Sequence, residues 1–224
     1  IPDRIRALEP SRDVLTYRRI ADFYWPLALT SVISLVVHPM VTFSLGQSRL
    51  PLESLAVYPV VTALIFIFRS MALSYQEVAI TLLDGTRENY RLIARFAFVL
   101  GVSATVGLVV IAFTPLAGVW FQTVSGLSKE LVELSVRPLR LFCLVPFFSV
   151  LLAFQRSILV FGRYTRPVTM ATLIEVTAIV GLLFLTIRVL DMVGVVGAVL
   201  ALFGGRLVGN TSMMFPAYRV LVAN

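Results

Sequence analysis

The apolar run from Leu52 to Leu83 constrains the fold more than any other stretch of this chain, because an arginine, Arg69, stands near its middle. About 20 apolar residues are enough to cross a bilayer as a helix, so the run predicts a transmembrane helix. A charge at bilayer depth is costly and usually faces the interior of a helix bundle or a water-filled cavity. We therefore expect the rest of the chain to supply helices that shelter Arg69.

The composition also indicates a membrane protein. Of the 224 residues, 58% are hydrophobic and 14% are charged, whereas soluble domains carry about 25% charged residues. We therefore predict an all-α integral membrane protein surrounded by the lipid bilayer. The lone cysteine, Cys143, excludes an intrachain disulfide, and the lone histidine, His38, leaves no metal motif because no acidic cluster accompanies it. We expect neither a metal nor a cofactor.

Short polar turns divide the apolar sequence into six expected spans, at about 23–45, 52–83, 92–113, 131–161, 168–189 and 193–218. Pro39 is expected to kink the first span, and the stretch AGVWFQTVSG (117–126) is expected to be an interfacial loop or a half-turn. Residues 1–20 are polar and predict a cytoplasmic linker before a six-helix lobe of 21–224. The chain begins at Ile1 and its start lacks the apolar core of a signal peptide, so we expect a fragment or the second half of a longer chain.

The basic residues predict which side of the membrane each loop faces, since cytoplasmic loops carry an excess of Lys and Arg. With six spans, eleven arginines fall on one side: Arg4, Arg6, Arg12, Arg18, Arg19, Arg87, Arg91, Arg95, Arg163, Arg166 and Arg219. Three to five basic residues fall on the other side: Arg49, Lys129 and Arg188, with Arg137 and Arg140 if they lie outside the hydrocarbon. This bias predicts a plasma (inner) membrane protein with both ends cytoplasmic. Arginines in loops between apolar spans also argue against a nucleic-acid partner.

Three charged residues lie deep in the expected spans: Arg69, Glu175 and Arg206. We expect Arg69 and Arg206 to line a cavity and attract an anionic substrate, with Glu175 as a counter-charge or proton carrier. Gln76 joins Arg69 as a candidate for substrate binding, because seven steps of about 100° return to the same helix face. The alternative is an internal ion pair that only holds helices together.

Two further residues are candidates for coupling or counter-charge. Glu77 lies near the cytoplasmic boundary, where a solvated surface role is the alternative, and His38 adjoins Pro39, where packing is the alternative. The glycines near Gly205 and Gly209 favour close helix packing over local unwinding beside a site. We find no catalytic motif and expect no enzyme.

Five segments resemble the progressive ankylosis (pyrophosphate transport) family, which belongs to the multidrug, oligosaccharidyl-lipid and polysaccharide exporter superfamily. They are IPDR (1–4), FYWPLAL (23–29), AVYPV (56–60), VRPLRLFCLVPFF (136–148) and GVVGAVLALFGGRLVGNTSMM (194–214). The resemblance implies a transporter of two six-helix lobes, twelve helices in all, that works by alternating access. This chain resembles the carboxy-terminal lobe, so its implied partner is a missing amino-terminal lobe or a second copy.

The resemblance implies export of an anionic small molecule such as pyrophosphate, a nucleotide or a citrate-like anion. A flippase for lipid-linked saccharides and a multidrug cation antiporter are the alternatives within transport. Outside transport, a membrane scaffold predicts that Arg69, Glu175 and Arg206 pair with each other and leave no polar cavity. An enzyme acting on lipid phosphates predicts a nucleophile and a base within hydrogen-bond reach.

Overall fold

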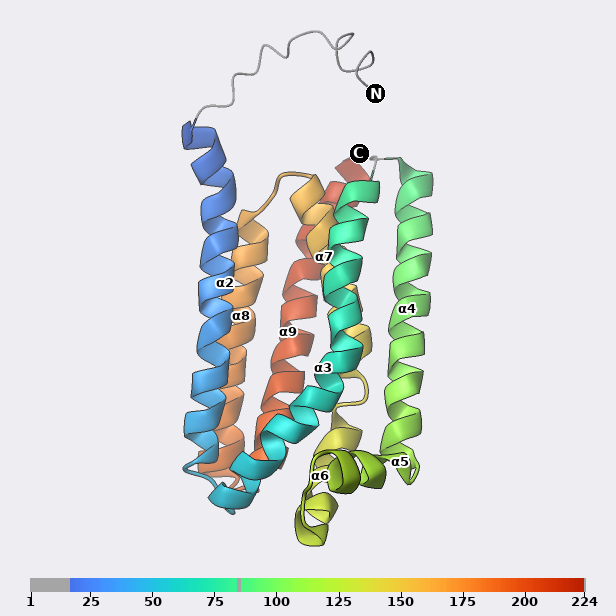
Figure 1. The fold of residues 1–224 in the computed structure, drawn as a ribbon. Helices are drawn as coiled ribbons and strands as arrows, with labels where there is room; N and C mark the ends of the chain where they lie inside the picture. The colour runs from blue at the N-terminus through green and yellow to red at the C-terminus, as the bar shows by residue number, and fades with distance from the viewer. Residues whose placement is uncertain (1–16, 84–85, 224) are drawn as a thin grey trace, which may run out of the picture.

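A computed structural model of the chain describes residues 17–83 and 86–223. The described residues form a bundle of long helices that run up and down side by side (Figure 1). In chain order the elements are α2 (Tyr17–Leu45), α3 (Pro51–Leu82), α4 (Arg87–Phe113), α5 (Leu116–Gly118), the π-helix η1 (Val119–Val124), α6 (Lys129–Leu141), α7 (Val145–Phe161), α8 (Arg166–Leu183), the π-helix η2 (Phe184–Val189) and α9 (Gly194–Ala223).

The described helices are those of an all-α membrane protein. In the part of the chain that the structure describes, five stretches are long and apolar enough to cross a bilayer: Tyr24–Leu45, Pro51–Leu82, Glu88–Phe113, Arg166–Val189 and Gly194–Leu221. The pair α6 and α7 becomes a sixth span if the two helices count together. The start of α2 and the end of α9 lie at one end of the bundle, and α5 and α6 lie at the other (Figure 1).

The expected fourth span, 131–161, is bent by 41° between α6 and α7. Pro146 in the first turn of α7 explains the position of the break. In a continuous helix its ring would clash with the carbonyl four residues earlier, that of Phe142, and it has no N–H to donate there. The Val145 N–H donates to that carbonyl instead, at 3.0 Å, in a tighter turn.

Two further expectations differ in detail from the structure. Residues 117–124, within the stretch expected as an interfacial loop or a half-turn, are helical as parts of α5 and η1. Pro39, where a kink is expected, lies inside α2, which is one helix from Tyr17 to Leu45. Most of the expected linker 1–20 lies outside the described residues, but its last four residues belong to α2.

Close packing of α9 on α8 depends on glycines, as the sequence predicted. A Cβ at Gly205 would clash with Ile179 and lie 3.2 Å from the Glu175 carbonyl oxygen. A Cβ at Gly209 would lie 2.9 Å from Oε2 of Glu175. Because α9 remains helical through both glycines, they serve packing rather than unwinding.

Two hydrophobic cores stack along the bundle. The core at the α5–α6 end includes Ile65 of α3 and Ile179 of α8, and the core near the chain ends includes Ala72 of α3 and Ala171 of α8. On both helices the two cores are separated by one or two turns. The deep charged residues lie in that gap.

Candidate functional site

Three arginines and one glutamate converge between the two cores. Arg69 comes from α3, Arg156 from α7, Glu175 from α8 and Arg206 from α9, and all four line one cavity of about 850 Å³. Each arginine lies close enough to the others and to Glu175 to interact electrostatically. The fold therefore gathers charges from four helices into one polar layer.

The cavity runs lengthwise along α3. Its lining begins at Leu55, near the α5–α6 end of the bundle, and reaches Arg69 in the middle of the helix. Fourteen residues of helix rise about 20 Å, which gives the approximate length of this wall. Val37, His38 and Thr42 of α2 form the facing wall. The arginines thus lie at the inner end of a long cavity.

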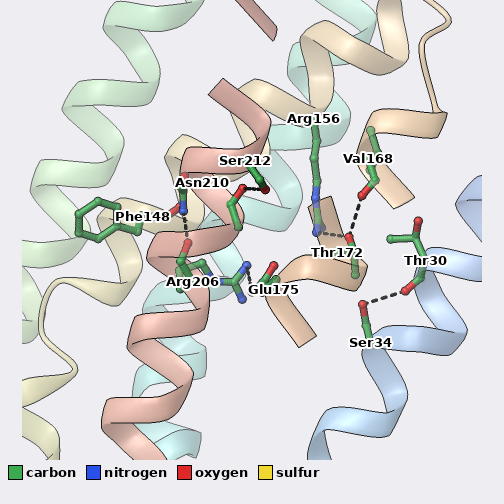
Figure 2. Close-up of polar contacts among 11 residues, drawn as sticks. Thr30, Ser34, Phe148, Arg156, Val168, Thr172, Glu175, Arg206, Asn210 and Ser212 are labelled. Atoms are coloured by element: carbon green, nitrogen blue, oxygen red, sulfur yellow. Dashed lines mark hydrogen bonds and ion pairs between the residues drawn. The ribbon is translucent and has the colours of Figure 1, made fainter. Parts of the chain in front are cut away.

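Glu175 and Arg206 form a buried ion pair. The Glu175 Oε1 atom lies 3.1 Å from Nη1 of Arg206, and their side chains are 8% and 18% exposed. Gly209 leaves the room that the carboxylate occupies. One turn along α9, the Asn210 amide donates to the carbonyl oxygens of Arg206 at 2.8 Å and Phe148 at 3.1 Å, which joins α9 to α7 (Figure 2).

Arg156 is held by a hydroxyl rather than by a carboxylate. Its Nη2 donates to Oγ1 of Thr172 at 3.2 Å, and the Thr172 hydroxyl donates to the Val168 carbonyl oxygen at 2.9 Å. Figure 2 shows the Arg156 side chain extended toward Thr172, beside the Glu175–Arg206 pair. Its Nε is buried and has no hydrogen-bond partner among the described residues.

Arg69 makes no hydrogen bond or ion pair with any residue in 17–83 or 86–223. Among the described residues, the cavity lining therefore holds three guanidinium groups against the single carboxylate of Glu175. The scaffold hypothesis predicted that the deep charges would pair off and leave no polar cavity. Its first half is met only in part, because Glu175 pairs with Arg206 but Arg69 has no partner in the described residues, and its second half is not met, because the cavity remains.

The structure brings four of the six predicted site residues together. Arg69, Arg206, Glu175 and His38 line the cavity, and Gln76 and Glu77 do not. Gln76 shares a helix face with Arg69 but lies about 10 Å farther along the axis, toward the end of the bundle where the chain ends lie. Glu77 is exposed at that end.

Sequence reasoning missed Arg156. Its place five residues before the end of α7 suggested a residue near the membrane boundary. A signal was present nonetheless, because Arg156 is the only charged residue in the apolar helix Val145–Phe161.

Within the described residues, no group of His, Cys, Asp and Glu side chains is placed to hold a metal ion. Comparisons with protein-family models, with curated proteins and with solved structures found no match. Function must therefore be argued from the cavity itself.

Proposed function

We propose that this chain is one six-helix lobe of a secondary transporter that exports an anionic small molecule. The observation that carries the proposal is the excess of positive charge in a cavity between long apolar helices, where three guanidinium groups face one carboxylate among the described residues. Charges within membrane spans usually mark substrate or ion pathways, because their burial has to be offset by a function or a partner.

An anion bound in the cavity supplies the negative charge that Arg69 and Arg156 do not find within the described residues. Arg69 has no partner in the described residues, and Arg156 has only the Thr172 hydroxyl. Guanidinium groups present a planar fork of donors that matches carboxylate and phosphate oxygens. A bound anion therefore offsets the cost of burying these two charges.

The same charges argue against the other hypotheses. A multidrug cation antiporter requires carboxylates facing the cargo. Among the described residues, Glu175 is the only acidic residue that lines the cavity, and it is already paired. The hypothesis of an enzyme acting on lipid phosphates requires a nucleophile activated by a base. The cavity hydroxyls of Ser34, Thr62 and Thr172 donate instead to backbone carbonyls of their own helices.

We extend the proposal to two lobes, as the resemblance implies. The two cavity walls, α2 and α3, contact each other little and pack mainly on other helices. A missing amino-terminal lobe or a second copy would cover this side, and alternating access would follow from movement between the lobes. Lipid-linked saccharides remain the second cargo class, because apolar residues such as Val37, Leu55 and Phe66 share the wall with the arginines.

The experiment expresses the complete gene in cells and measures extracellular pyrophosphate, nucleotide and citrate. We expect the wild type to raise at least one of these anions and Arg69→Gln to abolish the rise. Arg95→Gln is the matched control, because Arg95 is exposed on α4 and lies outside the cavity lining.

A rise that Arg69→Gln leaves intact would remove Arg69 from the pathway. No rise, with the protein present in the membrane, would reject export of these anions and direct the search to lipid-linked substrates.

A further inference from the structure

One face of α8 holds two arginines that come from two other helices. Thr172 and Glu175 are three residues apart on α8, so their side chains are neighbours on one face. Thr172 accepts a hydrogen bond from Arg156 of α7 at 3.2 Å, and Glu175 pairs with Arg206 of α9 at 3.1 Å. Helix α8 therefore sets the separation of two guanidinium groups at the inner end of the cavity (Figure 2).

Helix packing alone does not account for Arg156. No carboxylate among the described residues pairs with it, and its Nε is buried without a hydrogen-bond partner. It also lies close enough to Arg69 and Arg206 for mutual repulsion. A buried charge that repels its neighbours is costly. An anion in the cavity would reduce this cost for all three arginines.

We propose that Arg156, positioned by Thr172, determines the charge selectivity of the cavity, so that the cavity binds a dianion more tightly than a monoanion. The proposal rests on the proposed anion transport. Three guanidinium groups against one carboxylate leave an excess of two positive charges in the cavity. A monoanion leaves one of these charges uncompensated, whereas a dianion compensates both.

The test uses three probes with the same type of charged group at neutral pH: butyrate with one carboxylate, succinate with two and propane-1,2,3-tricarboxylate with three. The purified complete gene product is heated in detergent with each probe, and the concentration that gives half of the maximal rise in Tm is measured. The wild type is expected to respond to succinate at lower concentrations than to butyrate.

Substitutions of Arg156 and of Glu175 are expected to shift the preference among the three probes in opposite directions. Arg156→Gln removes one positive charge, and we expect it to reduce the preference for succinate over butyrate by about 30-fold or more, the size of effect typical of removing one partner of a buried charge pair. Arg156→Lys keeps the charge and retains most of the preference. Glu175→Gln adds one net positive charge and shifts the preference toward the tricarboxylate.

Thr172→Val separates positioning from charge, because it removes the acceptor for Arg156 and leaves the net charge unchanged. We expect a smaller loss of preference in the same direction as Arg156→Gln. If Arg156→Gln fails to fold, Thr172→Val and Glu175→Gln decide the test through the same ratio.

The deciding quantity is the ratio of the half-maximal concentrations of butyrate and succinate. An unchanged ratio in Arg156→Gln, or in both Thr172→Val and Glu175→Gln, would overturn the proposal. A wild type that exports anions from cells yet prefers butyrate or shows no preference would overturn this inference alone. Loss of all anion export would overturn the proposed function and this inference together.

Discussion

The three cavity arginines occupy different environments. Arg206 is paired with the Glu175 carboxylate, Arg156 is bound to the Thr172 hydroxyl, and Arg69 has no partner in the described residues. Burial makes these differences matter, because a buried charge without its partner is far more costly than an exposed one. The roles of the arginines in stability and in binding should therefore separate on substitution.

Removing one member of the Glu175–Arg206 pair leaves the other charge buried without its ion-pair partner. We expect Arg206→Gln or Glu175→Gln alone to reduce the free energy of unfolding by about 3–5 kcal/mol. The double variant should lose less than the sum of the two losses, which a double-mutant cycle of unfolding in detergent measures. If the loss in the double variant equals the sum of the two single losses, Glu175 and Arg206 do not stabilise each other. Arg69→Gln is the control and should not reduce the free energy of unfolding, because it removes a half-buried charge that has no partner in the described residues.

At the scale of elements, the site depends on how closely α9 packs against α8 and on the break between α6 and α7. Glycines on α9 bring its backbone against Ile179 and Glu175 of α8. The break brings Phe142 and Val145 to the cavity lining. Both features position the walls of the cavity, but neither adds a charged side chain to it.

Gly205→Ala should weaken the α8–α9 contact. The added methyl group clashes with Ile179, and such overpacking costs about 1–3 kcal/mol. The matched control is Gly181→Ala on α8, where a Cβ meets no atom within 4 Å. That variant should be neutral or more stable, because alanine favours a helix over glycine by about 1 kcal/mol. Equal changes in Tm for the two variants would contradict the packing argument.

Pro146→Ala should straighten the α6–α7 pair. It restores an N–H at position 146 and removes a ring clash that costs about 3 kcal/mol within a helix. We expect slower amide hydrogen exchange at residues 142–144 and a lower transport rate, because the cavity wall moves. Unchanged exchange at these residues would show that Pro146 does not cause the break.

At the scale of the whole molecule, a charged layer is placed between two hydrophobic cores, and the cavity extends from that layer toward the α5–α6 end. With the chain ends cytoplasmic, as the arginine bias predicts, the cavity would extend toward the outside. The membrane orientation therefore decides which side the cargo meets in this conformation.

Cysteine labelling in a Cys143→Ser background tests the orientation. Ser128→Cys, before α6, should react with an impermeant thiol reagent added outside intact cells. Tyr164→Cys, between α7 and α8, should react only after permeabilisation, because an odd number of crossings separates the two positions. Reaction of both from the same side would show that the α6–α7 pair does not cross the membrane.

The sequence predicted the long helices because apolar runs of transmembrane length leave few alternatives to a helix. It also placed Arg69, Glu175 and Arg206 at depth, since each lies near the middle of its run. It did not predict the Arg156–Thr172 bond, because contacts between helices depend on rotations that local sequence does not determine. The sequence predicted that Arg69 and Arg206 line a cavity, but it did not predict the length or the other walls of that cavity, because the lining comes from five helices at once.

The most direct test of an anion site in the cavity is protection of a cavity cysteine by an anion. Thr62→Cys in the Cys143→Ser background places a thiol on the α3 wall of the cavity, and Ser128→Cys serves as the exposed control. We predict that an impermeant thiol reagent labels both positions from outside and that pyrophosphate slows labelling only at Thr62→Cys. Labelling of Thr62→Cys that neither pyrophosphate nor citrate slows would contradict anion binding in this cavity.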